Sequence, residues 1–229
     1  MTGKPLKVKR FFRNPAEEVL VKICGIKNEM EAEAAIASGA DALGFNLYPA
    51  SKRFLDWRRA ENWIRQLPLE IARVAILVNP SPADFLAIIQ EETFDAIQLH
   101  GDETPDFFEI VPESSKPLIK AFRVKDRSSL ANAESYPVFA FLLDSWQVGH
   151  FGGTGKEFDW AVLGGVILNK PIIAAGGLNP HNVGKAVRQL RPHAVDVACG
   201  VEDSTGRKQE ARMREFVLAA KAPPKSRVA

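Results

Sequence analysis

The sequence predicts a closed barrel of eight parallel strands, each followed by a helix. Short apolar runs alternate with segments of helical character about eight times, at roughly 25 residues per unit. Connections this short between strands of one sheet are helical crossovers, so the strands are expected to be parallel. The chain has 229 residues, of which 46% are hydrophobic, and this length and apolar content suit such a barrel.

The first unit begins with a strand at residues 19–25. Alternation along this strand places Lys22 and Cys24 on one face and aliphatic side chains on the other. Asn28 is suited to cap a following helix at residues 29–38. A polar group at the carboxyl end of a barrel strand occupies the position of catalytic residues in this fold. A free cysteine is more often a buried, inert side chain, so other strand ends must support the assignment.

The remaining strands and helices follow in the same order. The strand at residues 71–78 is almost continuously apolar, as a parallel sheet covered on both faces requires. Pro105 marks the start of the fourth helix. The other expected strands are residues 40–46, 95–99, 118–122, 138–143, 171–175 and 195–199, and the other expected helices are residues 57–67, 79–92, 128–135, 158–163, 180–190 and 208–221.

A doubly wound open sheet is the alternative fold. It normally has fewer units and a glycine fingerprint directly after its first strand, where this chain has only C-G-I-K-N. We therefore expect one barrel domain at residues 19–221. Residues 1–18 are expected to form a flexible or surface-lying, solvated extension, and residues 222–229 a linker-like tail.

Charge and cysteine content narrow the classes of function. The 30 basic and 28 acidic residues give a net charge of +2, which creates no overall field for nucleic acid or an anionic membrane, so neither partner is expected. The two cysteines have neither metal-ligand nor disulfide spacing, which fits a reducing cytoplasm and no metal site. Residues 1–18 are basic but lack the apolar stretch of a secretory signal.

Polar residues and glycines recur at the carboxyl ends of the expected strands. In a barrel these ends converge on one mouth. Each residue alone has a structural explanation, such as a solvated loop charge or a helix cap, but together they indicate a site. The residues are Cys24, Arg53, Gln98, His100, Arg123, Asp144, Gly176, Gly177, Cys199 and Gly200.

Glycine-rich turns in the last third of the chain predict a phosphate site. The loops after strands seven and eight are a common phosphate-binding position in barrels, and glycine lets backbone amides approach an anion. A nucleotide-binding P-loop is excluded, because it needs glycine where His150 stands and serine or threonine where Glu157 stands. A small phosphorylated substrate is therefore expected. The candidate phosphate-binding residues are Gly153, Thr154, Gly155, Gly176, Gly177, Cys199 and Gly200.

Seven motifs occur in order along the chain. They are K-I-C-G (22–25), G-A-D-A-L-G-F (39–45), Y-P-A-S-K-R (48–53), Q-L-H-G-D-E (98–103), G-G-T-G-K-E-F-D-W (152–160), A-G-G-L (175–178) and V-D-V-x-x-G-V-E (195–202). Together they resemble the phosphoribosylanthranilate isomerase family of tryptophan biosynthesis, over about residues 20–218. The chain departs from the family pattern at Ala198 and Cys199, where the family usually has serines, so neither position offers a hydroxyl to a phosphate.

The resemblance implies an Amadori rearrangement of N-(5-phosphoribosyl)anthranilate to the corresponding 1-amino-1-deoxyketose. An acid must protonate the furanose ring oxygen, and a base must then remove the proton on the adjacent carbon. By resemblance, Asp144 is the acid and Cys24 the base. Lys22 would favour the thiolate if its ammonium approached Cys24. The reaction needs no metal or organic cofactor.

The resemblance also implies how the substrate is held. Arg53 is the candidate for binding the substrate's carboxylate, through an exposed guanidinium fork. Gln98, His100 and Arg123 are further candidates for substrate binding. The expected partner is a small phosphorylated molecule, and the chain is expected to be a monomer or homodimer.

Two other functions remain open. One is another phosphosugar barrel enzyme, such as an indole-glycerol-phosphate synthase or the histidine-pathway isomerase, but the latter would need acidic catalytic residues on strands one and eight. Cys24 discriminates against this class. The other is a non-catalytic paralogue that keeps the pocket for binding, which only the change at residues 198–199 favours. Intact Cys24 and Asp144 argue against it.

Overall fold

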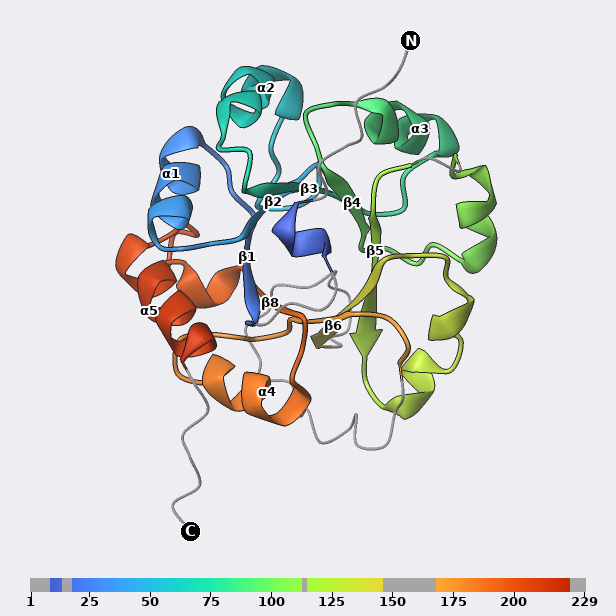
Figure 1. Ribbon diagram of the computed structural model, residues 1–229. Coiled ribbons are helices and arrows are strands. Elements are labelled where there is room, and N and C mark those ends of the chain that lie inside the picture. The colour runs from blue at the N-terminus through green and yellow to red at the C-terminus, as the bar shows by residue number, and fades with distance from the viewer. Residues whose placement is uncertain (1–8, 14–17, 113–114, 146–167, 223–229) are drawn as a thin grey trace.

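The computed structural model describes residues 9–13, 18–112, 115–145 and 168–222, and its strands form a closed barrel (Figure 1). All eight strands are parallel, and each pairs with its neighbours in chain order, from β1–β2 round to β8–β1. The predicted barrel is confirmed, and the open-sheet alternative is wrong. The strands are Leu20–Cys24 (β1), Ala42–Asn46 (β2), Ala72–Leu77 (β3), Ala96–Leu99 (β4), Leu118–Val124 (β5), Ala140–Ser145 (β6), Ile172–Ala174 (β7) and Ala194–Val197 (β8).

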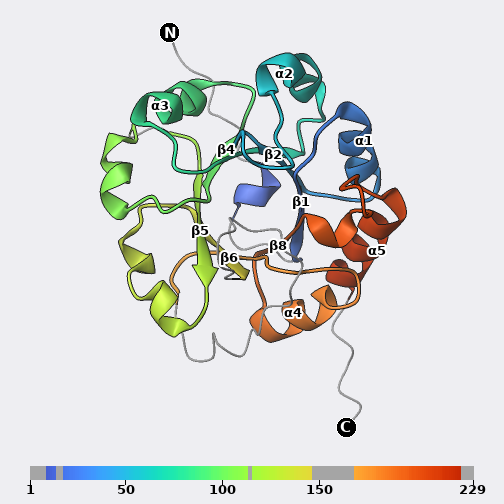
Figure 2. The same ribbon diagram turned by 180° about the vertical axis from the view of Figure 1, so that it is seen from behind.

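Helices surround the ring of strands in both views of the molecule (Figures 1 and 2). Asn28 caps α1 as expected, by accepting a hydrogen bond from the backbone N–H of Glu31. No helix among the described residues is long and apolar enough to cross a bilayer. The α-helices of the described residues are Glu29–Ala37 (α1), Trp57–Gln66 (α2), Pro82–Gln90 (α3), Val183–Leu190 (α4) and Glu210–Lys221 (α5).

Two expected helices are replaced by short 3₁₀ turns. The segment from Pro105 is the 3₁₀ helix η2, Pro105–Ile110, and residues 128–135 form η3, Arg127–Leu130, and η4, Ala133–Ser135. At η3 the backbone N–H of Ser128 donates to the side chain of Asp126, and the backbone N–H of Asp126 donates to the hydroxyl of Ser129. These hydrogen bonds compete with those of a longer α-helix. The helix expected at residues 158–163 lies outside the described residues.

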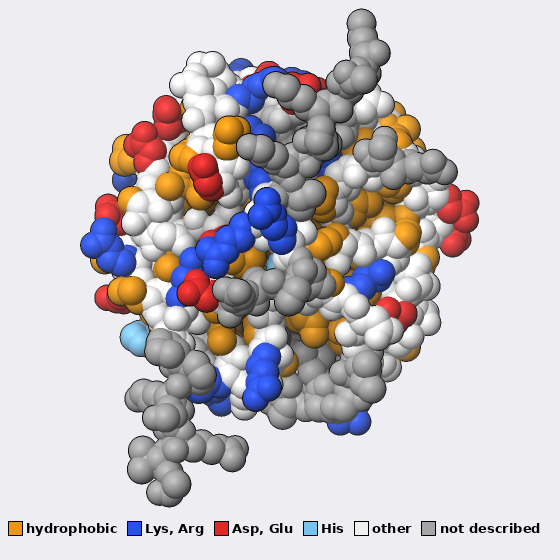
Figure 3. All heavy atoms as spheres, in the orientation of Figure 1, with side chains coloured by type: hydrophobic (Ala, Val, Ile, Leu, Met, Phe, Trp, Pro, Cys, Tyr) orange, Lys and Arg blue, Asp and Glu red, His pale blue; other side chains and the backbone are white. Residues whose placement is uncertain are grey.

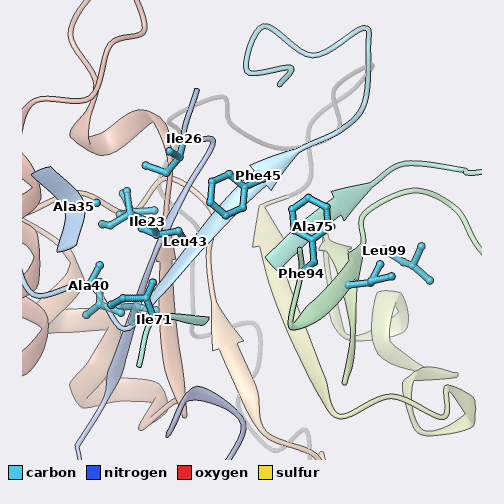
Figure 4. Packing of buried hydrophobic residues seen from close by; sticks show 14 of the residues in the cluster. Ile23, Ile26, Ala35, Ala40, Leu43, Phe45, Ile71, Ala75, Phe94 and Leu99 are labelled. Carbon is cyan, nitrogen blue, oxygen red and sulfur yellow. The ribbon is translucent and has the colours of Figure 1, made fainter. Parts of the chain in front are cut away.

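Each strand buries both of its faces. Alternate residues point outward into a layer between strands and helices, where Ile23 and Leu43 lie beside Ala35 of α1 (Figure 4), and Phe45 contacts Phe94. The residues between them point into the barrel, where the apolar cluster contains many alanines. Burial on both sides explains why the strands are nearly continuous apolar runs.

The inward positions change from apolar to polar along the barrel. Near the strands' amino ends they include Leu20, Ala72 and Ala96, whereas Cys24 and Asp144 lie near the carboxyl ends of β1 and β6. A polar inner surface is therefore confined to the carboxyl end, which is the functional end of this fold.

The amino end of the barrel is closed by part of the N-terminal extension. Residues Arg10–Phe12 form a 3₁₀ helix, η1, and its Phe11 side chain is 0% exposed. Phe11 packs edge-on against His193, and Phe12 against Phe139, at ring-centroid distances of 6.1 and 5.7 Å. His193 and Phe139 lie just before β8 and β6, so the two phenylalanines plug the end opposite the mouth.

Polar contacts fasten this plug to other strand starts. Lys9 Nζ donates to the carbonyl of Ile71 and to Asp95 Oδ2, both at 2.6 Å, and His193 Nε2 lies 2.8 Å from the Phe11 carbonyl. Burial lowers the pKa of Lys9 even though Asp95 opposes this change. Basic side chains also gather near the centre of the face shown in Figure 3.

The expectation of a flexible or surface-lying extension is therefore wrong for residues 9–13. The alanines at inward positions leave room at the amino end, and the two phenylalanines fill it. The rest of the extension, apart from residue 18, and residues 223–229 lie outside the described residues.

We expect Phe11→Ala to destabilise the protein without changing its site. Loss of a fully buried phenylalanine side chain costs about 3–5 kcal/mol. For a chain of this size, such a loss lowers the melting temperature by on the order of 10 °C. Thermal denaturation measures the effect, with Leu69→Ala as control because Leu69 is exposed. A melting temperature equal to that of the unmodified protein would show that η1 does not plug the barrel in solution.

Candidate active site

The described strand-end residues of the sequence analysis all lie at the carboxyl end of the barrel. Arg123 of β5 and Asp144 of β6 are direct register partners, so they lie side by side on the inner face. Arg53 lies in the loop after β2, Gly176 and Gly177 follow β7, and Cys199 and Gly200 follow β8. The predicted residues Gly153, Thr154 and Gly155 lie outside the described residues.

Cys24 shares a buried chamber with an ion pair. Lys22 is 0% exposed, and its Nζ lies 2.7 Å from Oδ1 of Asp196, its register partner on β8. Gly44 is the register partner of Cys24 on β2, and a Cβ atom built there would lie 3.0 Å from both Cys24 Sγ and Lys22 Nζ. The thiol and the ammonium therefore occupy the space that glycine leaves open.

Burial keeps Cys24 in its neutral form. Removal from water raises the pKa of the thiol, and the negative charge of Asp196 raises it further. The cations Lys22, Lys208 and Arg53 oppose this shift but do not reverse it. Lys22 therefore favours the thiolate as expected, but burial and Asp196 outweigh its effect.

Arg53 is held by a buried carboxylate. Its Nε and Nη2 donate to Glu202 Oε1 and Oε2 at 2.6 and 2.7 Å, and Arg53 is only 8% exposed. The expectation that Arg53 exposes its guanidinium to solvent is therefore wrong. Lys208 Nζ donates to the same carboxylate at 2.8 Å and to the carbonyl of Ala198 at 3.0 Å. Although burial opposes ionisation, Arg53 and Lys208 lower the pKa of Glu202 to about 2.

Lys208 and Glu202 were not recognised in the sequence as site residues. The sequence predicts Lys208 as the first residue of the closing helix, but α5 begins at Glu210. Lys208 instead forms an isolated antiparallel β-bridge with Glu202. A lysine at the start of a helical pattern has no spacing that distinguishes it from a solvated one. The only signal for Glu202 was its place at the end of the V-D-V-x-x-G-V-E motif.

Gln98, His100 and Asp144 form a row across the mouth. Gln98 Nε2 lies 2.8 Å from His100 Nδ1, and His100 Nε2 lies 3.3 Å from Asp144 Oδ2. Asp144 is 4% exposed, and its Oδ1 accepts a hydrogen bond of 2.8 Å from the backbone N–H of Ser145. Gly176 borders this carboxyl at φ 83°, and a Cβ atom there would lie 2.4 Å from Ser145 N. The site therefore requires glycine at this position.

A second buried network supports the loop that carries His100. Glu103 accepts hydrogen bonds from the backbone N–H groups of Asn79 and Gly101. Lys120 Nζ donates to Glu103 Oε2 at 2.7 Å and to the carbonyl of Gly101 at 2.8 Å. These contacts join the loop after β4 to β3 and β5, and fix the path of the chain just after His100.

The ends of β7 and β8 lie next to each other, as the phosphate prediction requires. Gly176 and Gly177 both have positive φ, at 83° and 66°, and Cys199 begins a 3₁₀ turn that ends at Val201. Both cysteines are free thiols. Within the described ranges, no group of three or more His, Cys, Asp and Glu side chains could hold a metal ion.

Comparison with solved structures gives close matches over the whole barrel. A phosphoribosylanthranilate isomerase in complex with reduced 1-(o-carboxyphenylamino)-1-deoxyribulose 5-phosphate superposes with a TM-score of 0.77 at 35% identity, covering 89% of this chain and 98% of the other. Monomers of the dimeric enzyme from Thermotoga maritima match with the same coverage, at 34% identity and a TM-score of 0.77.

Comparison of sequences points to the same proteins. The N-(5'-phosphoribosyl)anthranilate isomerase of Geobacter sulfurreducens is 44% identical over 203 residues, which cover 89% of this chain and 98% of that protein. The family model described as N-(5'phosphoribosyl)anthranilate (PRA) isomerase matches residues 21–219. The match spans every strand except the first residue of β1, and on this basis the chain belongs to the N-(5'-phosphoribosyl)anthranilate isomerase family.

Proposed function

We propose that the chain isomerises N-(5'-phosphoribosyl)anthranilate to 1-(2-carboxyphenylamino)-1-deoxyribulose 5-phosphate in tryptophan biosynthesis, with Asp144 as acid and Cys24 as base. The order of strands carries the proposal. The barrel places β7 and β8, with their candidate phosphate-binding residues, between Asp144 on β6 and Cys24 on β1. A substrate held there by its phosphate presents its sugar to both groups. The complex of a family member with the reduced product supports this substrate class.

The proposed reaction conserves all atoms of the substrate. Asp144 donates a proton to the furanose ring oxygen, the bond from that oxygen to the anomeric carbon breaks, and the nitrogen lone pair forms a protonated imine. Cys24, once its thiol has released its own proton, takes the proton from the adjacent carbon as a thiolate, which leaves an enolamine. The Cys24 thiol formed in this step gives its proton to the former anomeric carbon, and loss of the enol hydroxyl proton gives the ketone. The proton from the enol hydroxyl returns to Asp144, so the enzyme is regenerated.

Arg53 would bind the anthranilate carboxylate in this arrangement. It lies after β2, next to β1 in the barrel, and Glu202 engages its Nε and one hydrogen of Nη2. The remaining guanidinium N–H groups are left for a planar anion. Glu202 thereby fixes the orientation of the fork, and because Lys208 shares the same carboxylate, the three side chains keep a net positive charge for the substrate's anion. Gln98, His100 and Arg123 remain candidates for contact with the substrate's sugar.

The setting of the reaction completes the proposal. Two free thiols are consistent with a reducing cytoplasm. The Thermotoga maritima relative is described as dimeric, so a homodimer as well as a monomer is proposed for this chain. Nucleic acids and membranes are not expected as partners, since the net charge is only +2.

We expect Cys24→Ala and Asp144→Asn each to reduce turnover by on the order of 100-fold or more, because each removes one proton-transfer group. Consumption of freshly generated phosphoribosylanthranilate, followed by fluorescence, measures the loss. Asp106→Asn serves as control because Asp106 is exposed on η2. Near-normal turnover in either folded variant would refute the assigned role.

We expect Arg53→Lys to raise KM by about 10-fold or more for the natural substrate, because lysine keeps the charge beside Glu202 but loses the fork. An aniline analogue without the carboxylate should show a much smaller change. Arg59→Lys is the control, since this arginine's side chain is 90% exposed. An equal effect on both substrates would mean that Arg53 does not bind the carboxylate.

We expect Glu202→Gln to remove part of the acid dependence of stability. The pKa of Glu202 is about 2 in the folded protein against an ordinary 4.5, so its contribution is complete above pH 4.5 and is lost as the pH falls toward 2. The variant should lose about 3 kcal/mol of unfolding free energy at pH 7.

Urea denaturation between pH 7 and pH 2 tests this expectation. The difference between variant and unmodified protein should shrink as the solution is acidified, because the unmodified protein then protonates Glu202 as well. Glu109→Gln is the control because Glu109 is exposed. A difference that stays constant over this range would contradict the expected ionisation of Glu202.

A further inference from the structure

One carboxylate oxygen near the mouth has no partner among the described residues. Asp196 of β8 uses Oδ1 to accept a hydrogen bond of 2.7 Å from Lys22 Nζ, and no described group donates to its Oδ2. The described side-chain atoms that are buried without a partner are Gln98 Oε1 and His100 Nε2, so Oδ2 is not completely buried. Because the Asp196 side chain is only 8% exposed, this oxygen has a narrow opening to the space at the mouth.

The other buried carboxylates at this end of the barrel have protein groups facing both of their oxygens. Both oxygens of Glu202 accept from the guanidinium of Arg53, and the two oxygens of Glu103 accept from a backbone N–H and an ammonium. Asp144 has one oxygen bonded to a backbone N–H and the other facing an imidazole. Among the described residues, Asp196 is therefore the buried carboxylate with an oxygen left for a ligand.

Asp196 lies beside the proposed base. Its strand, β8, pairs with β1, where Lys22 is its register partner and Cys24 follows two residues later on the same inner face. Burial raises the pKa of the Cys24 thiol, and among the charged groups Asp196 raises it most. Such an effect requires the carboxylate and the sulfur to be near each other. The two groups therefore border the same space.

Lys22 fixes the direction in which Asp196 points. Lys22 is 0% exposed, and although burial opposes its charge, the carboxylate of Asp196 and the sulfur of Cys24 raise its pKa. The ammonium lies in the space that Gly44 leaves open, where a Cβ atom would be 3.0 Å from Nζ. Since Oδ1 is bound to this fixed charge, Oδ2 is preorganised to accept a hydrogen bond from another group.

A carboxylate oxygen in this position selects a neutral hydrogen-bond donor. The phosphate and the carboxylate of the proposed substrate are anions that Asp196 would repel, so neither of them binds here. The sugar between them carries hydroxyl groups, and each hydroxyl can donate one hydrogen. The carbon from which Cys24 takes a proton carries one of these hydroxyls, and this carbon must approach the sulfur.

We propose that Asp196 binds the sugar hydroxyl on the carbon that Cys24 deprotonates, and thereby turns the hydrogen of that carbon toward the sulfur. The inference rests on the proposed function. In that function the loops after β7 and β8 hold the phosphate and Arg53 holds the carboxylate, which fixes both ends of the substrate but leaves its middle free to rotate. A hydrogen bond from the hydroxyl to Oδ2 fixes the middle as well.

Two ligands that differ in this one hydroxyl test the contact. The first is reduced 1-(o-carboxyphenylamino)-1-deoxyribulose 5-phosphate, which a family member binds and which carries a hydroxyl where the ketone was reduced. The second is the same compound without that hydroxyl. We expect the unmodified protein to bind the first about 10-fold or more tightly than the second, because the second lacks a hydrogen bond to a charged acceptor. Isothermal titration calorimetry measures both dissociation constants.

Substitution of Asp196 should remove this preference. Asp196→Asn keeps the shape of the side chain and an oxygen for Lys22, and should reduce the ratio of the two dissociation constants to about threefold or less. Asp106→Asn is the matched control, because Asp106 is exposed, and should keep the full ratio. Lys22→Met combined with Asp196→Leu removes both buried charges together and should also lose the preference. A ratio like that of the unmodified protein in either folded variant would overturn the proposal.

The same measurements separate this inference from the proposed function. If the unmodified protein binds neither ligand, the proposed substrate is wrong and the inference falls with it. If it binds both equally well, Asp196 does not hold the hydroxyl, and the inference fails while the proposed function stands. With the natural substrate, Asp196→Asn should lower kcat/KM by about 10-fold or more, and an unchanged value would also contradict the inference.

Discussion

The closed interior of the barrel requires every charged side chain inside it to have a partner. A charge removed from water costs several kcal/mol unless another charge or several hydrogen bonds compensate it. Lys22 pairs with Asp196, and Arg53 and Lys208 share Glu202. These pairs decide which groups at the mouth remain neutral. Cys24 is one of them, because burial and the carboxylate of Asp196 outweigh the ammonium of Lys22.

The same enclosed geometry explains the opposite end of the molecule. Inward positions at the amino ends of the strands are mostly small, so the barrel alone leaves space there. Phe11 and Phe12 fill this space, and they precede residues 21–219, the part that the family model matches. The closure of this end therefore depends on a segment outside the part of the chain that the family model matches. It lies far from the mouth, so stability and catalysis are served by opposite ends of one barrel.

Local sequence patterns predicted the fold and the residue types of the site, but not the charge pairs. Alternation along each strand and the polar residues at strand ends are local features. The predicted barrel and the predicted set of residues at its mouth depend only on them. Lys22 and Asp196 are 174 residues apart, and Arg53 and Glu202 are 149 residues apart. Such pairs exist only because β8 closes onto β1. The sequence therefore predicts Cys24 as a neighbour of the Lys22 ammonium but does not reveal Asp196. For the same reason it predicts an exposed guanidinium at Arg53 and does not reveal Glu202.

Pairing of the charges also fits the substrate of the proposed reaction. Phosphoribosylanthranilate is anionic at both ends, through its phosphate and its carboxylate, and its sugar between them reacts. In the proposed function, the glycine loops after β7 and β8 and the guanidinium of Arg53 bind these ends. A thiolate and a carboxylate at the centre would repel such a dianion and each other. A resting thiol at Cys24 reduces that repulsion. The charge that each group carries during the reaction then lies in a buried site where the surrounding dipoles are already fixed.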